Sequence, residues 1–295
     1  MEWSGFLAVS KPAGLTSRQV VDRVAKIVRP AKAGHAGTLD PMAVGLLVIA
    51  IGPATRLISY VQQGRKEYSA GFRLGITTDT DDIEGRVLDV RNYGDVTGSM
   101  LLEAASGLEG VIMQMPPQYS ALHVDGQRAY ALARQGLQAD LKARPVEVHS
   151  LQLTRFNPPD FECEITCGSG TYIRSIGRDI GAKLGCGATM TWLQRTTIGQ
   201  FWIGKATSLE GLDEERIRQE ILPPVHAVAH LPKRRVDDLE SSALRQGKTI
   251  PLGTIRSPDS QNQVAVIDED SELVGIAEID IERNRIQPRI IFPRK

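Results

Sequence analysis

The sequence of 295 residues predicts an α+β protein, and three patterns in the chain support this prediction. Segments that alternate apolar and polar residues, as strands do, are separated by single helical segments. A polar insertion with several basic and aromatic residues interrupts them near the middle of the chain. After about residue 231 helices become scarce and short strand-like segments follow one another, which is typical of a small β-rich domain. We therefore expect a larger domain over residues 1–231 and a smaller one over residues 232–295.

The first part of the chain predicts a strand, a helix and a stiff turn. Residues 7–9 form a short apolar strand, and a helix begins after Thr16 or Ser17 and ends before Pro30. A turn over residues 34–45 carries one carboxylate, Asp40. Glycines precede Asp40 and a proline follows it, so the backbone that holds this carboxylate is expected to be rigid. The apolar run at residues 46–51 fits a buried strand or the start of a helix.

The next segments predict further strands around an acidic loop. Residues 65–74 alternate as a strand does, with Tyr68 and Phe72 on one face. The acidic residues 77–85 depart from the calcium-binding pattern of an EF-hand, because Ile83 replaces an oxygen ligand. We expect them to form a solvated turn before a strand at residues 86–90. A helix is expected at residues 97–108.

The insertion over residues about 117–146 has the composition of an RNA-contacting arm. Its basic residues can meet phosphates, and Tyr119 and Tyr130 can stack on bases. A solvated helix and loop is the alternative. Strands are predicted at residues 146–156 and 161–167, and a glycine turn then opens a helix. Tyr172 and Arg174 stand at this strand-to-helix junction, where scaffolds often place reactive groups.

Composition excludes some classes of protein and leaves others open. Lys+Arg and Asp+Glu both number 35, so a nucleic-acid binder would need its cations gathered on one face. The three cysteines lack zinc-site or disulfide spacing. The N-terminus does not resemble a secretory signal, and no apolar run is long enough to span a bilayer, so we expect a cytoplasmic protein. Residues 199–206 resemble a P-loop, but Ala206 stands where the magnesium-binding hydroxyl would be.

Short stretches in a fixed order carry a resemblance to a known family. They are residues 11–17 (KPAGLTS), 34–41 (GHAGTLDP), 66–68 (KEY), 73–80 (RLGITTDT), 116–122 (PPQYSAL), 170–174 (GTYIR) and Leu193. Together they resemble bacterial TruB-type tRNA pseudouridine synthases, and the tail resembles the PUA-like RNA-binding domain of that family. The resemblance implies a mixed, largely antiparallel sheet with helices and an inserted RNA-binding arm. It also implies isomerisation of uridine 55 in the T loop of tRNA, without a metal or an organic cofactor.

The resemblance also assigns roles to residues of this chain. Asp40 would either attack C1′ as a nucleophile or remove the 2′ proton. Arg174 would pair with Asp40 and keep it ionised, and Tyr172 would help to remove the C5 proton. Tyr68 would stack on the target base, and Leu193 would form an apolar wall of its pocket. His35 would fill the gap left by the flipped base, and Lys11 and Tyr119 would contact the RNA.

Two other classes of function compete with this expectation. A non-catalytic RNA-binding or tRNA-folding protein would bind the same RNA without turnover. A metal-dependent hydrolase would use the acidic loop at residues 79–84 and lose activity with EDTA. The resemblance favours an enzyme that acts on tRNA as a monomer, with no membrane and no protein partner.

Overall fold

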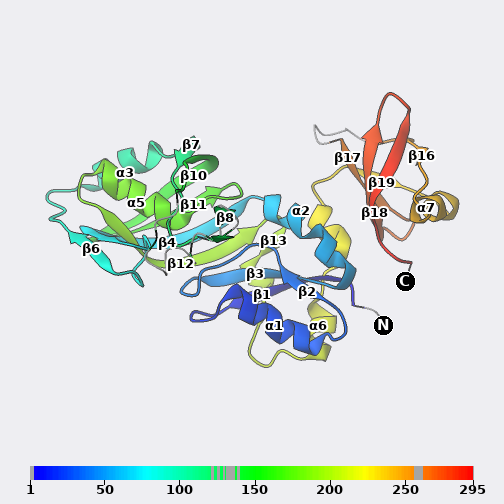
Figure 1. Cartoon of the computed structure of the whole chain (residues 1–295), viewed down its shortest axis with the longest axis horizontal. Coiled ribbons are helices and arrows are strands. Elements are labelled where there is room, and N and C mark those ends of the chain that lie inside the picture. Colours follow the sequence, from blue (N-terminus) through cyan, green and yellow to red (C-terminus); the bar gives the residue numbers. More distant parts are fainter. Residues whose placement is uncertain are drawn as a thin grey trace.

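The computed structural model describes residues 3–120, 123–124, 127–128, 130, 137, 140–255 and 262–294. Figure 1 shows a large sheet with helices packed against it and a smaller β-rich unit at the C-terminal end. Within these residues no helix has the length and apolar character needed to cross a membrane. Part of the predicted arm lies outside the described residues. Its described part includes a two-stranded ladder of β8 (His123–Val124) and β9 (Gln127–Arg128).

The large sheet contains ten of the described strands. They are β1 (Gly5–Lys11), β2 (Ala33–His35), β3 (Val44–Ile51), β4 (Lys66–Leu74), β7 (Gly110–Gln114), β10 (Arg144–Asn157), β11 (Asp160–Cys167), β12 (Ala188–Ile198), β13 (Phe201–Trp202) and β14 (Thr207–Ser208). The main path is β14-β1-β3-β12-β4-β11-β10-β7, with β13 beside β12 and β2 beside β3. Among the described pairs of this sheet, β1 with β14 and β12 with β3 run parallel and the others antiparallel. The predicted mixed, largely antiparallel α+β class is confirmed.

The helical segments cover the sheet and connect its strands. They are α1 (Ser17–Ile27), η1 (Gly52–Leu57), α2 (Ile58–Gln63), α3 (Gly98–Ser106), α5 (Ile173–Lys183), η2 (Ile203–Lys205), α6 (Glu214–Glu220), η3 (Pro224–Val228) and α7 (Asp238–Arg245). The expected cap of α1 is confirmed, because Thr16 and Gln19 form a capping box. A short hairpin of β5 (Ile76–Thr78) and β6 (Val87–Val90) flanks the acidic loop.

The two faces of β3 enter different hydrophobic cores. Leu47 and Ile49 pack with α1, whereas Leu46 and Val48 pack toward η1 and the C-terminal unit. Burial on both faces explains why residues 46–51 form an unbroken apolar run and not an alternating one. The run is a strand, which decides between the two alternatives that the sequence left open.

The C-terminal unit is a five-stranded sheet with one helix. Its strands, in the order β15-β17-β18-β19-β16, are β15 (Lys233–Arg235), β17 (Gln263–Ile267), β18 (Leu273–Asp280), β19 (Arg285–Ile291) and β16 (Ile250–Pro251). The predicted small β-rich unit is confirmed. Leu231, Ala265 and Phe6 belong to one buried cluster, and Tyr60 of α2 is hydrogen-bonded to Gln263 of β17, so the C-terminal unit shares a core with the rest of the chain. The division of the chain at residue 231 stays a prediction.

Candidate active site

Asp40 lies in an irregular turn between β2 and β3, and its side chain is 35% exposed. Ser17, in the first turn of α1, fixes the residue before it: the Ser17 hydroxyl accepts from the Leu39 N–H at 2.8 Å and donates to the Leu39 carbonyl at 3.0 Å. Because an irregular buried backbone needs such partners, the turn is held by side chains of other elements. The expected rigid support of Asp40 is thus present.

Lys11, at the end of β1, supports the other side of Asp40. Its ammonium donates to the carbonyls of Pro12, Leu15 and Pro41 at 3.0, 2.7 and 3.1 Å, and its side chain is buried. Three donors therefore meet three acceptors. Burial lowers the pKa of Lys11 to about 8, and the nearby Asp40 opposes this shift. The expected RNA contact of Lys11 stays a prediction.

The lowered pKa of Lys11 predicts a loss of activity at alkaline pH. Above pH 8 the side chain becomes an amine with two N–H donors, so one carbonyl of the three loses its partner. We expect kcat/KM to fall about tenfold between pH 7.5 and 9.5, because small displacements of a reacting group are costly. A pH profile of kcat/KM measures this.

Unfolding does not account for that loss. Between the folded pKa of about 8 and the ordinary 10.5, the unfolded chain binds more protons at Lys11, so this group makes the folded state more stable as pH rises. The Lys11→Met variant should be less active but should lack this alkaline fall. A fall that persists in Lys11→Met would contradict the assignment.

Arg174, in the first turn of α5, pairs with Asp40. Its Nε lies 3.0 Å from Oδ2 of Asp40, and its side chain is 6% exposed. The same guanidinium donates to the carbonyls of Thr80 and Tyr119 at 2.7 and 3.0 Å, and it lies 3.5 Å from Asp82. The predicted pairing of Arg174 with Asp40 is confirmed. A buried, multiply bonded guanidinium holds the carboxylate in a fixed orientation.

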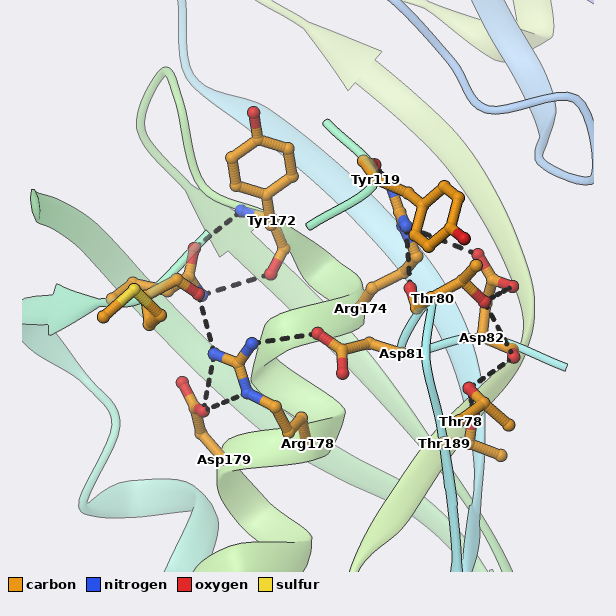
Figure 2. A network of polar contacts seen from close by, with 12 residues as sticks. Thr78, Thr80, Asp81, Asp82, Tyr119, Tyr172, Arg174, Arg178, Asp179 and Thr189 are labelled. Atoms are coloured by element: carbon orange, nitrogen blue, oxygen red, sulfur yellow. Dashed lines mark hydrogen bonds and ion pairs between the residues drawn. The ribbon is translucent and has the colours of Figure 1, made fainter. Parts of the chain in front are cut away.

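The acidic loop is a turn, as predicted, but the prediction that it is solvated was wrong for its aspartates, because Asp82 is buried and Asp81 half-buried. Figure 2 shows Asp81 and Asp82 beside Arg174 and Arg178, which lie on successive turns of α5. Arg178 pairs with Asp81 at 2.9 Å and donates to the Met115 carbonyl at 2.7 Å. Burial raises the pKa of both aspartates, and hydrogen bonds or charges from the facing groups oppose the shift.

The sequence contained a signal for this network. Arg174 and Arg178 are four residues apart in a predicted helix, so they share one face. Two arginines on a buried helix face need acidic partners. The loop at residues 79–84 has four acidic residues and could supply these partners.

Tyr172 and Tyr119 are the two tyrosines expected near Arg174. Tyr172 precedes α5, and its backbone N–H and carbonyl both bond to the Gln114 side chain, at 2.8 and 3.1 Å. Its ring points away from Arg178 in Figure 2 and lies 5.1 Å from the guanidinium carbon of Arg144. Tyr119 meets Arg174 through its carbonyl. Their expected roles toward substrate stay predictions.

Tyr68 and Leu193 lie on the adjacent strands β4 and β12 and are 7% and 6% exposed. Burial raises the pKa of Tyr68, whereas Arg195 opposes the shift by its charge and a hydrogen bond. His35 ends β2, and burial followed by the charge of Arg195 lowers its pKa. A neutral imidazole is therefore favoured there.

Arg195, on β12, is a residue of the site that the sequence reasoning missed. It is fully buried, and its guanidinium donates to the carbonyls of Gly37, Thr38 and Leu46. Among the described residues, no cluster of three or more His, Cys, Asp or Glu side chains has the arrangement of a metal site.

The pair of Asp40 with a buried arginine, on a mixed and largely antiparallel sheet, agrees with the site expected from the resemblance to pseudouridine synthases. Comparison with known proteins narrows this class. Residues 25–173 match the model of the TruB family pseudouridylate synthase (N terminal domain), and residues 174–228 and 232–292 match two models of its C-terminal part. The chain belongs to the TruB family of pseudouridylate synthases.

Relatives of this chain are similar over nearly their whole length. The tRNA pseudouridine synthase B of Synechococcus sp. (strain CC9311) is 39% identical, covering 98% of this chain and 97% of its own. That of Thermobifida fusca (strain YX) is 40% identical, covering 98% of both. A solved H/ACA RNP bound to a substrate RNA containing 2′-deoxyuridine has a chain with a TM-score of 0.75 and 26% identity, covering 98% of this chain and 85% of its own.

Proposed function

We propose that this protein isomerises uridine to pseudouridine in tRNA, at position 55 of the T loop. The observation that carries the proposal is the 3.0 Å ion pair between Asp40 and the buried Arg174, on a fold shared with the TruB family. The relatives named tRNA pseudouridine synthase B support tRNA as the substrate. The choice of position 55 rests on the motif resemblance. A non-catalytic RNA binder would not need a carboxylate held this way.

The reaction breaks one bond and forms another within a single nucleotide. The N1–C1′ bond of uridine is broken, uracil rotates, and a C5–C1′ bond forms. The C5 proton leaves and N1 gains a proton, so atoms and electrons balance without an oxidant or reductant. Asp40 acts either as the nucleophile at C1′ or as the base that removes the 2′ proton. In both routes the carboxylate oxygens react, and the contact with Arg174 fixes their position.

The target uridine has to leave the stacked T loop before Asp40 can reach it. Flipping a base out costs on the order of a few kcal/mol, which contacts to the RNA must offset. We assign to His35 the role of filling the space that the flipped base leaves. Tyr68 and Leu193 are assigned as walls of the pocket that receives the base. A neutral His35 and two buried walls suit an uncharged base. Tyr119 is assigned to the RNA side, and tRNA phosphates to the arm.

The roles of Tyr172 and Tyr68 can be distinguished by variants that lack only the hydroxyl group. Tyr172→Phe should lower kcat by about 10²-fold or more if its hydroxyl helps to move the C5 proton. Tyr68→Phe keeps the ring that stacks and should change kcat less than about tenfold. Single-turnover rates with saturating enzyme measure both effects. A large loss in Tyr68→Phe alone would transfer the proton role to Tyr68.

The position of the reaction is tested with tRNA carrying tritium at C5 of its uridines. Wild-type protein should release tritium from an unmodified transcript and not from a matched transcript with cytidine at position 55. Equal release from both transcripts would exclude position 55. Absence of release from either would favour the non-catalytic alternative, and binding of the transcript would then show whether RNA is recognised at all.

A further inference from the structure

Arg195 reaches the Asp40 turn from the neighbouring strand and holds both of its ends. Its Nε donates to the Leu46 carbonyl at 2.9 Å, after the turn. Its two terminal nitrogens donate to the Thr38 and Gly37 carbonyls at 3.4 and 3.0 Å, before Asp40. The side chain is 1% exposed and is the largest of the fully buried side chains among the described residues. One planar group therefore fixes the distance between the two flanks of the turn.

Two glycines allow β12 and its arginine to come this close. At Gly45 a Cβ atom would lie 2.4 Å from the Arg195 carbonyl, and at Gly37 it would lie 3.4 Å from Nη1. Both glycines have φ in the left-handed region, +99° and +116°. Side chains are therefore excluded at Gly45 and strained at Gly37. The turn is built around the guanidinium.

The hydrogen-bond partners of the Arg195 guanidinium are backbone carbonyls, which carry no formal charge. Within the described part of the chain no carboxylate forms an ion pair with it. A buried cation is costly, and an aliphatic side chain of similar size would fill the same space without that cost. The groups whose pKa responds to its charge are Lys11, His35, Lys66 and Tyr68, which surround it from β1, β2 and β4. Packing alone therefore does not account for a guanidinium at this place.

We propose that Arg195 is a positioning residue for the isomerisation, which fixes the backbone on both sides of Asp40 and so sets its carboxylate against the target ribose. This inference rests on the proposed function. Arg174 orients the Asp40 carboxylate directly, whereas Arg195 acts through the turn that carries it. Rate is more sensitive than binding to such placement, because a displacement of about 1 Å can cost on the order of 10²-fold in rate.

The test replaces the planar fork and keeps the positive charge. Arg195→Lys replaces three nitrogens spaced along a planar group by a single ammonium, which cannot reproduce the spacing that reaches both flanks of the turn. We expect the single-turnover rate per folded molecule to fall about 10- to 100-fold, with the Kd for tRNA changed less than about threefold. Leu47→Ala is the matched control, because Leu47 is buried in β3 beside the turn but faces α1. It should lower the unfolding temperature and leave the rate per folded molecule unchanged.

A second variant alters the turn and not Arg195. Gly37→Ala adds a methyl group against Nη1 of Arg195 and should give the same split between rate and binding, even if Arg195→Lys does not fold. Normal rates in the folded variants, or a loss that lies in tRNA binding, would overturn the inference while the wild type stays active. A wild type that forms no pseudouridine would instead overturn the proposed function, and this inference with it.

Discussion

Replacing Asp40 by Asn should abolish pseudouridine formation while tRNA binding persists. The amide has the size of the carboxylate but cannot act as a nucleophile at C1′ or as a base toward the 2′ proton, so both chemical routes are lost. We expect kcat to fall by about 10³-fold or more, since general base or nucleophilic groups contribute on this scale. Single-turnover assays with saturating protein measure the loss, and filter binding measures the Kd.

The same variant distinguishes chemistry from folding. Asp40 is 35% exposed, so the neutral amide can be accommodated without burying an unpaired group. Removal of its charge leaves Arg174 with Asp82 and two carbonyls as partners. The unfolding temperature should therefore change little. Turnover close to that of the wild type in Asp40→Asn would rule out Asp40 as the reacting group.

Replacing Arg174 by Lys should also cause a large loss of activity. Lysine keeps the positive charge but replaces the planar fork that contacts Asp40, Thr80 and Tyr119 at once. We expect kcat to fall by about 10²-fold, because the carboxylate loses its fixed orientation. Truncation to Met would also leave the buried Asp82 without its cationic partner, and breaking a buried ion pair typically costs about 3–5 kcal/mol of stability. The Lys variant is therefore the sharper test.

Arg178 provides the matched control, one turn further along α5. It is also an arginine with two aspartate partners and a carbonyl partner, but Asp40 is not among its contacts. Arg178→Lys should lose a similar amount of stability and retain kcat within about threefold, since its partners are removed from the reacting atoms. Equal losses of kcat in the two variants would show that α5 matters through its fold and not through the Arg174–Asp40 pair.

Local patterns were sufficient for most of the fold. The capped helix α1, strands β4 and β11 and the β-rich C-terminal sheet follow from periodicity and turn residues, which act over a few neighbouring positions. The run at residues 46–51 was ambiguous because burial on both faces removes the alternation that marks a strand.

The supports of the candidate site were harder to predict. The Asp40–Arg174 pair was expected from the family motifs, whereas the acidic loop and Arg195 were missed. Lys11 and Arg195 donate hydrogen bonds to backbone carbonyls. Because every residue has a carbonyl, the residue types in the sequence do not indicate which residues these donors contact. The glycines at positions 37 and 45 indicate that another segment comes close to the turn. The sequence does not show which segment, because β12 with Arg195 is far away along the chain.

The most direct test of the account is the nucleoside composition of an unmodified tRNA after incubation with the wild-type protein alone. The account predicts that one uridine per tRNA is lost and one pseudouridine is gained, with no added metal or cofactor, and that Asp40→Asn gives neither change. Unaltered uridine after incubation with folded, tRNA-binding wild type would contradict the account.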